Sequence, residues 1–169
     1  MTNPHYLTGS QIFSAGSRLT IEPGTLICTD GGFMLFHTGS RLTAIGTAAA
    51  PITFTPTNPA STWSGIQLGD VTSYVATPLA DTSVLTNLVL ARAAKGFGAV
   101  NGREQHVVLM DSVRIRQSYY AGATVLSPGS RMIRSIVDTV GTGGSVTFAV
   151  SVGRGTIQAT TIRPGPTGA

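Results

Sequence analysis

Five residues, Gly-Ser-Arg-Leu-Thr, occur twice in this chain, at positions 16–20 and again at positions 39–43. In the second half, four similar segments follow one another at a constant interval and begin at Val84, Val108, Met132 and Thr156. A repeating unit this short cannot bury its own apolar side, so it stacks on its neighbours. The repeat therefore predicts a solenoid.

Within each repeat, apolar side chains alternate with small or polar ones, which is typical of a strand with one buried face. The short strands are separated by turn sequences such as Glu-Pro-Gly, Asp-Gly-Gly and His-Thr-Gly-Ser. With about three short strands in each repeat, the pattern predicts an all-β chain. We expect a right-handed, single-stranded parallel β-helix with about seven turns of 23–24 residues.

The constant spacing of the repeats also predicts which side chains share a column along the coil. A buried apolar column is expected from Leu85, Leu109, Ile133 and Ile157. A polar ladder that satisfies backbone groups at a corner is expected from Asn87, Asp111 and Ser135. The repeat divides the chain into an N-terminal cap or arm over residues 1–15, the β-helix over 16–163 and a tail over 164–169. A segment near 69–83 breaks the repeat and is predicted to protrude as a loop.

The composition argues against several classes of function. Only 11% of the residues are charged, and the net charge of +4 comes from arginines that are scattered along the chain. A nucleic-acid-binding surface clusters its basic residues, so no nucleic-acid partner is expected. Cys28 is the single cysteine, and His5, His37 and His106 are far apart in the sequence, so no metal or cofactor is expected. No uninterrupted apolar run is long enough to span a bilayer, and therefore no membrane insertion is expected.

Two stretches carry a resemblance to a known family. The run SRLTAIGTAAAPITFTPTNPASTWSGIQL, followed by VLTNLVLARAAKGFGAV, resembles the right-handed parallel β-helix proteins of the pectate-lyase-like superfamily. The resemblance covers residues 16 to about 140. It implies the β-helix fold, but the fold serves lyases, hydrolases, bacterial surface proteins and phage tailspikes alike.

An enzyme of this family would need acidic residues close together. The lyases use clustered carboxylates to hold calcium, with a nearby arginine or lysine as base. In this chain Asp138 lies slightly more than one repeat beyond Asp111, so the two are the residues to test as a glycosidase-type pair. The alternative is that Asp111 belongs to the structural ladder at a corner. No GxSxG motif is present.

Arginines also recur at the period of the coil. Arg18 and Arg41 occupy the same position of the repeated pentapeptide, and Arg92 and Arg116 are one period apart, so each pair is predicted to stack. Like charges on neighbouring strands repel, which favours contact with an acidic partner surface. The alternative is that the side chains spread into solvent, where the repulsion is screened.

These observations favour a non-enzymatic structural protein that forms a homotrimer on a larger assembly. The most concrete form is a capsid decoration (cement) protein, or a short tailspike or fibre, at the surface of a virion. Expected partners are other copies of the chain and a capsid or tail. A cell-surface glycan is a further candidate partner. One alternative is a β-helix that binds or cleaves a polysaccharide. Another is an adhesion module at a bacterial surface.

Overall fold

The computed structural model describes residues 4–70, 81–93, 99–103, 105–118, 121–125, 127–140 and 148–164. This part of the chain is built from strands and turns and contains no helix. No helix that could cross a membrane is therefore found among these residues.

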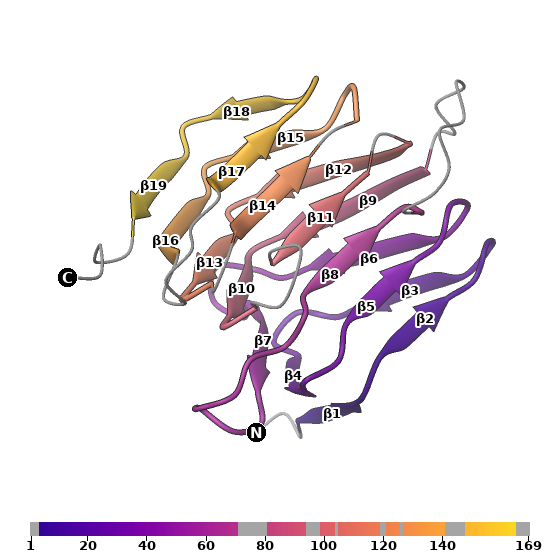
Figure 1. The fold of residues 1–169 in the computed structure, drawn as a ribbon, viewed down its shortest axis with the longest axis vertical. Helices are drawn as coiled ribbons and strands as arrows, with labels where there is room; N and C mark the ends of the chain where they lie inside the picture. Colours follow the sequence, from indigo (N-terminus) through magenta and orange to yellow (C-terminus); the bar gives the residue numbers. More distant parts are fainter. Residues whose placement is uncertain are drawn as a thin grey trace.

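The strands form three parallel sheets (Figure 1). Sheet A contains, in spatial order, β1 (His5–Thr8), β4 (Leu26–Asp30), β7 (Ile52–Pro56), β10 (Leu88–Ala91), β13 (Arg114–Arg116), β16 (Ile136–Val140) and β19 (Thr161–Pro164). Sheet B contains β2 (Gln11–Phe13), β5 (Met34–Phe36), β8 (Ile66–Leu68), β11 (Val100–Gly102), β14 (Ala121–Val125) and β17 (Phe148–Val152). Sheet C contains β3 (Arg18–Ile21), β6 (Arg41–Ile45), β9 (Asp81–Thr86), β12 (His106–Asp111), β15 (Arg131–Ile133) and β18 (Thr156–Gln158).

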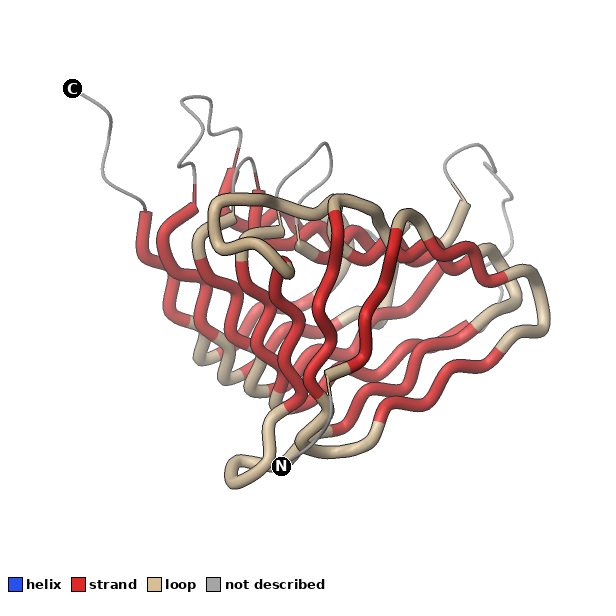
Figure 2. Tube along the Cα trace, turned by 90° about the horizontal axis from the view of Figure 1, so that it is seen from below, coloured by secondary structure: helices blue, strands red, loops and turns tan. Residues whose placement is uncertain are grey.

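Consecutive strands always belong to different sheets, so the chain coils around an axis and adds one strand to each sheet per turn. Figure 2 shows the three sheets enclosing a common interior. The described residues give sheets of seven, six and six strands, which is six complete three-strand turns and the first strand of another. The predicted parallel β-solenoid is confirmed, and the expected number of about seven turns is slightly too high.

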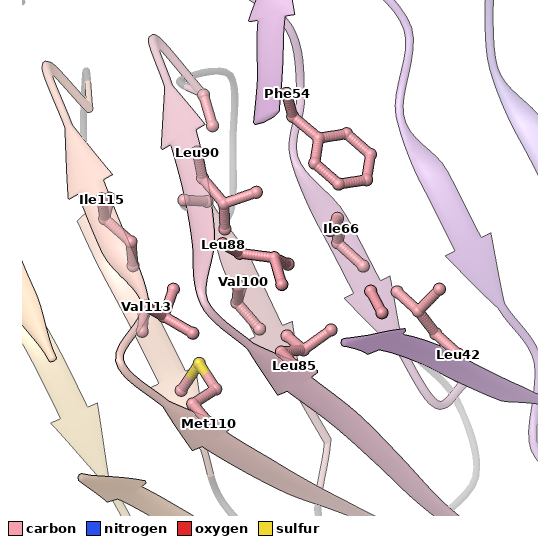
Figure 3. Packing of buried hydrophobic residues seen from close by; sticks show 14 of the residues in the cluster. Leu42, Phe54, Ile66, Leu85, Leu88, Leu90, Val100, Met110, Val113 and Ile115 are labelled. Carbon is pink, nitrogen blue, oxygen red and sulfur yellow. The ribbon is translucent and has the colours of Figure 1, made fainter. Parts of the chain in front are cut away.

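The interior is filled by columns of apolar side chains that stack from turn to turn (Figure 3). In sheet A the register partners Ile27, Phe54, Leu90, Ile115 and Val137 form one column, and each is at most 5% exposed. Burying a side chain of this size contributes about 1.5–3 kcal/mol. Because the contribution recurs in every turn, the columns hold the coil together.

The predicted column on sheet C is wrong in its register. Leu85 pairs with Met110, and Leu109 pairs instead with Val84, on the outer face of the sheet. Met110 continues the buried column through Met132. Paired positions differ by 25, 22 and 25 in successive turns rather than by a constant 24. A slip of one residue moves every side chain of a strand to the opposite face.

The corner between sheets C and A has the same length in these turns, because Leu90, Ile115 and Val137 each follow their buried sheet C residue by five positions, so the irregular spacing arises in the rest of the turn. From β9 onward, one residue at this corner of each turn adopts a left-handed backbone conformation, with φ between 47° and 55°: Asn87, Ser112, Arg134 and Ala159. The backbone N–H of Asn87 donates to the carbonyl of Asp111 at 3.0 Å, and equivalent bonds follow from the next two corner residues. The predicted ladder of Asn87, Asp111 and Ser135 is therefore wrong: Asn87 aligns with Ser112 and Arg134.

The coil begins earlier than the sequence suggests. Residues 5–13 carry β1 and β2, which pair with β4 and β5, so most of the region predicted as a cap or arm is part of the first turn. At the other end, β19 closes the described part at Pro164. The predicted loop near 69–83 falls largely on residues 71–80, outside the described residues, and β9 begins at Asp81.

The register can be tested by truncating one leucine on the inner face of sheet C and one on its outer face. Leu85 is fully buried and Leu109 lies on the outer face, half-buried. Replacing Leu85 by alanine should lower the free energy of unfolding by about 2–5 kcal/mol. Leu109→Ala should cost no more than about 1 kcal/mol. Urea unfolding measures both, and equal losses would contradict the register.

Candidate functional site

Asp111 lies at the end of β12 on the outer face of sheet C. Its carboxylate accepts a hydrogen bond from Arg134 Nε at 2.9 Å and a second one from Arg134 Nη2. The Ser112 hydroxyl donates to the same carboxylate at 3.0 Å. Two parallel bonds between a guanidinium and a carboxylate fix both groups in one orientation. Asp111 is therefore held in a charge-neutral pair with Arg134, which comes from the next turn.

Asp138 lies in β16 on the outer face of sheet A, among arginines. Its neighbours in register are Arg116 on one side and Arg163 on the other. Arg114 Nη2 is 3.7 Å from Asp138 Oδ2. Asp138 therefore faces a basic environment on a different sheet from Asp111.

The use of the two aspartates as a catalytic pair stays a prediction. Glycosidase carboxylates flank one bond of one substrate, at separations of roughly 5–9.5 Å. Here Asp111 and Asp138 belong to different sheets, and each carboxylate faces its own arginine. Whether the protein has an activity that depends on either residue stays a question for experiment.

Arg18 and Arg41 are register partners on β3 and β6, as the repeat predicts. Both side chains are exposed on the outer face of sheet C. Arg41 Nε lies 3.9 Å from Asp81 Oδ1, whereas Arg18 has no ion pair among the described residues. The stacking is observed, and its use as a partner contact stays a prediction.

Arg92 and Arg116 do not stack, so this prediction is wrong. Arg116 pairs with Ala91, and Arg92 occupies a corner between sheets A and B with φ of 55°. The Arg92 guanidinium donates to the Ser61 carbonyl at 3.2 Å and to Gln117 Oε1 at 3.4 Å. The error has the same origin as on sheet C, because this turn is longer than the average repeat.

The outer face of sheet C carries a shallow groove of about 460 Å³. Its floor includes the half-buried side chains of Val84, Leu109 and Ile133, which follow from the corrected register. Asp111 and the exposed Arg131 stand at its sides. We call this surface the sheet C face. Sequence reasoning placed Leu109 and Ile133 in the core and so missed it.

The corner between sheets B and C gathers ionisable side chains from three successive turns. The His37 imidazole contacts the Asp70 carboxylate through Nδ1, and the backbone N–H of Thr38 donates to Asp70 at 3.1 Å. Burial alone would raise the pKa of Asp70, but the hydrogen bonds from His37 and Thr38 outweigh it. The pKa of Asp70 therefore lies below its usual value.

A buried serine–histidine contact lies beside this pair. Ser83 Oγ is 2.8 Å from His106 Nε2 and accepts the Leu42 N–H at 2.9 Å. His106 is 1% exposed, and its Nδ1 has no hydrogen-bond partner. Burial lowers the pKa of His106 to about 4, and the charge of Arg41 lowers it further, while Asp81 opposes the shift. Ser83 and His106 are both enclosed in the corner, and their contact links two successive turns.

The corner also shows what sequence reasoning could not find. His37, Asp70 and His106 come from three turns, and only strand pairing brings them together. Among the described residues, no group of three or more His, Cys, Asp or Glu side chains could hold a metal ion. The one signal in the sequence was that Asp70 and Asp81 lie near the two ends of the segment that breaks the repeat.

Comparison of the chain with models of known protein families, with curated proteins and with solved structures finds no match.

The buried histidine makes stability depend on pH. An unfolded chain protonates histidine near pH 6.5, whereas folded His106 binds its proton only near pH 4. Between these values the unfolded state binds more protons, so stability should fall as the pH decreases from about 6.5 to 4. The total loss should be about 3 kcal/mol.

Urea unfolding between pH 7 and pH 4 measures this slope. His106→Gln, which cannot titrate, should reduce it, whatever its effect on stability at neutral pH. His5→Gln, at an exposed position, serves as the control and should keep the wild-type slope. An unchanged slope in His106→Gln would contradict the assignment.

Proposed function

We propose that this chain is a non-enzymatic structural module that joins a larger protein assembly as a homotrimer of side-by-side coils. In its most concrete form it is a capsid decoration protein, or a short tailspike or fibre, at the surface of a virion. The alternative location for the same module is a bacterial cell surface.

The observation that carries the proposal is the composition of the sheet C face. Its centre is apolar, with Val84, Leu109 and Ile133 half-buried in adjacent columns. Exposed arginines border it on both sides, with Arg41 toward one end of the coil and Arg131 toward the other. An apolar centre with a polar rim is the usual anatomy of a protein interface. The excess of arginine favours an acidic surface on the assembly that the module joins.

The stacking of the coil suits this role. Each turn adds one strand to sheet C, so the face runs along the coil and neighbouring copies can contact one another side by side. Three copies with their sheet C faces toward a common axis would cover Leu109 and its neighbours in one closed arrangement. Arg41 and Arg131 would then remain at the edges of the contact.

A charge placed at the centre of this face should separate the copies. Leu109→Asp should reduce the number of copies in the oligomer threefold, as measured by light scattering after gel filtration. Leu26→Asp introduces the same change at a half-buried outer position of sheet A and should leave the oligomer intact. An oligomer that tolerates Leu109→Asp would contradict the use of this face.

A second candidate function is binding or cleavage of a polysaccharide in the same groove. The observation that favours it is an arginine and a carboxylate, Arg131 and Asp111, beside an apolar floor. A polysaccharide enzyme should release reducing ends from a glycan, and Asp111→Asn or Asp138→Asn should abolish that release. The structural module should keep its oligomeric state in both variants.

A further inference from the structure

Within the described part of the chain, the first turn of the coil ends in three unpaired strand edges. β1, β2 and β3 are the outermost strands of sheets A, B and C, and they lie together at one end of the rod (Figure 1). An edge strand directs half of its backbone N–H and C=O groups away from its neighbour, where they are ready to pair with another strand. We call this end the β1–β3 end, and the structure describes all residues of these three strands.

The β1–β3 end is also an open apolar surface. A cavity of about 420 Å³ lies there, lined by Leu7, Phe13, Leu19 and Ile21 among others. One turn further in, the partners of Phe13 and Leu19 are fully buried, but Phe13 and Leu19 themselves are only partly covered. The Phe13 ring stacks on Phe36 with a centroid separation of 4.3 Å and offers its other face to the cavity. The interior columns therefore end in exposed apolar groups.

We propose that two copies of this chain join through their β1–β3 ends, related by a two-fold axis perpendicular to the coil. A partner that covers the β1–β3 end must supply three strand edges around an apolar centre. The same end of a second copy supplies them. A two-fold axis through β3 places β3 antiparallel to its equivalent and places β1 against β2 of the other copy. This contact uses a different surface from the sheet C face and does not rest on the proposed function.

The register of β3 follows from its backbone. The Arg41 N–H donates to the Ser17 carbonyl at 2.9 Å, so residues 17, 19 and 21 pair with β6. Arg18 and Thr20 therefore direct their backbone groups toward the free edge, whereas Glu22 follows β3 and its carbonyl accepts hydrogen bonds from the Thr25 N–H and hydroxyl. An antiparallel pairing centred on Thr20 satisfies the backbone N–H and C=O of Thr20 in both copies. It also sets Leu19 against Ile21 of the second copy, inside the joined cores.

The same register brings opposite charges together. Thr20 faces its own equivalent, and two positions away Arg18 faces Glu22 of the second copy. Both side chains are exposed, and neither has an ion pair among the described residues. They cannot pair within one strand, because four residues of β-structure span about 13 Å. The two-fold axis repeats the Arg18–Glu22 contact, so the edge of β3 is complementary to itself.

The other two edges carry the most exposed large apolar side chains of the described residues. Tyr6 on the outer face of β1 is 63% exposed, and Ile12 on the outer face of β2 is 59% exposed. When β1 of one copy lies antiparallel to β2 of the other, Tyr6 can face Ile12 across the junction. Leu7 and Phe13 then point into the joined interior. One symmetry operation therefore accounts for the charges, the cavity and the exposed apolar groups.

The experiment exchanges charges across the two-fold axis. Arg18→Glu gives a copy with two acidic positions, and Glu22→Arg gives one with two basic positions. Each variant alone should raise the dissociation constant of the contact at least tenfold, as measured by sedimentation velocity. An equimolar mixture should recover the wild-type contact, and so should the double variant Arg18→Glu/Glu22→Arg. Arg154→Glu, an exposed arginine near β18, is the matched control and should have no effect.

The outcomes separate this contact from the proposed trimer. Loss of the β1–β3 contact halves the number of copies in the assembly, whereas Leu109→Asp reduces it threefold. Circular dichroism confirms that the variants fold. A wild-type chain that remains without a two-fold partner at high micromolar concentration overturns the inference. So does a contact that survives Arg18→Glu, or a mixture of the two single variants that fails to associate.

Discussion

The parallel pairing of each strand with the strand one turn away is the constraint on which the rest of the structure depends. It aligns Phe54 with Leu90 and Leu90 with Ile115, so one hydrogen-bonded ladder also builds one apolar column. A slip by one residue would turn Leu85 and its buried neighbours out and bring Leu109 and its neighbours in. The column that contains Leu85 and the column that contains Leu109 differ in side-chain size and in hydrophobic content. The buried interior therefore selects one register in every turn.

This constraint explains how far the sequence could predict the fold. The verbatim repeat at 16–20 and 39–43 predicts the pairing of Leu19 with Leu42 correctly, because the two copies occupy equivalent positions in successive turns. The second half keeps a constant interval only on average. Individual turns are longer or shorter than that average, and the difference lies outside the corner between sheets C and A, where Met110 and Ile115 keep the same separation as Leu85 and Leu90. An averaged period still predicts that apolar and polar residues alternate along each strand. It does not predict which of the alternating residues face the interior.

The same argument separates the parts of the candidate site that sequence could and could not predict. Asp111 and Asp138 were identifiable as candidates from their spacing, but strand pairing fixes which arginine each one meets. The pairs His37–Asp70 and Ser83–His106 join side chains from different turns that share no sequence motif. They form because the coil superimposes successive corners. The sheet C face could not be predicted, because it depends on the strand register that places Leu109 on the surface and not in the core.

A solenoid has two kinds of surface, and they differ in what a partner must supply. On the sides, backbone groups are already paired, so a partner of the sheet C face needs only complementary side chains. At the β1–β3 end, backbone groups and apolar columns are both open, and a partner must bring strands in a matching arrangement. Any exposed strand edge would satisfy part of that requirement, which makes such an end prone to indiscriminate pairing. Arg18 and Glu22 oppose this, because a strand that does not present the opposite charges at the same spacing leaves both without partners. Selectivity at the end of the rod therefore depends on two charges, while the strength of the contact comes from backbone pairing and the closed core.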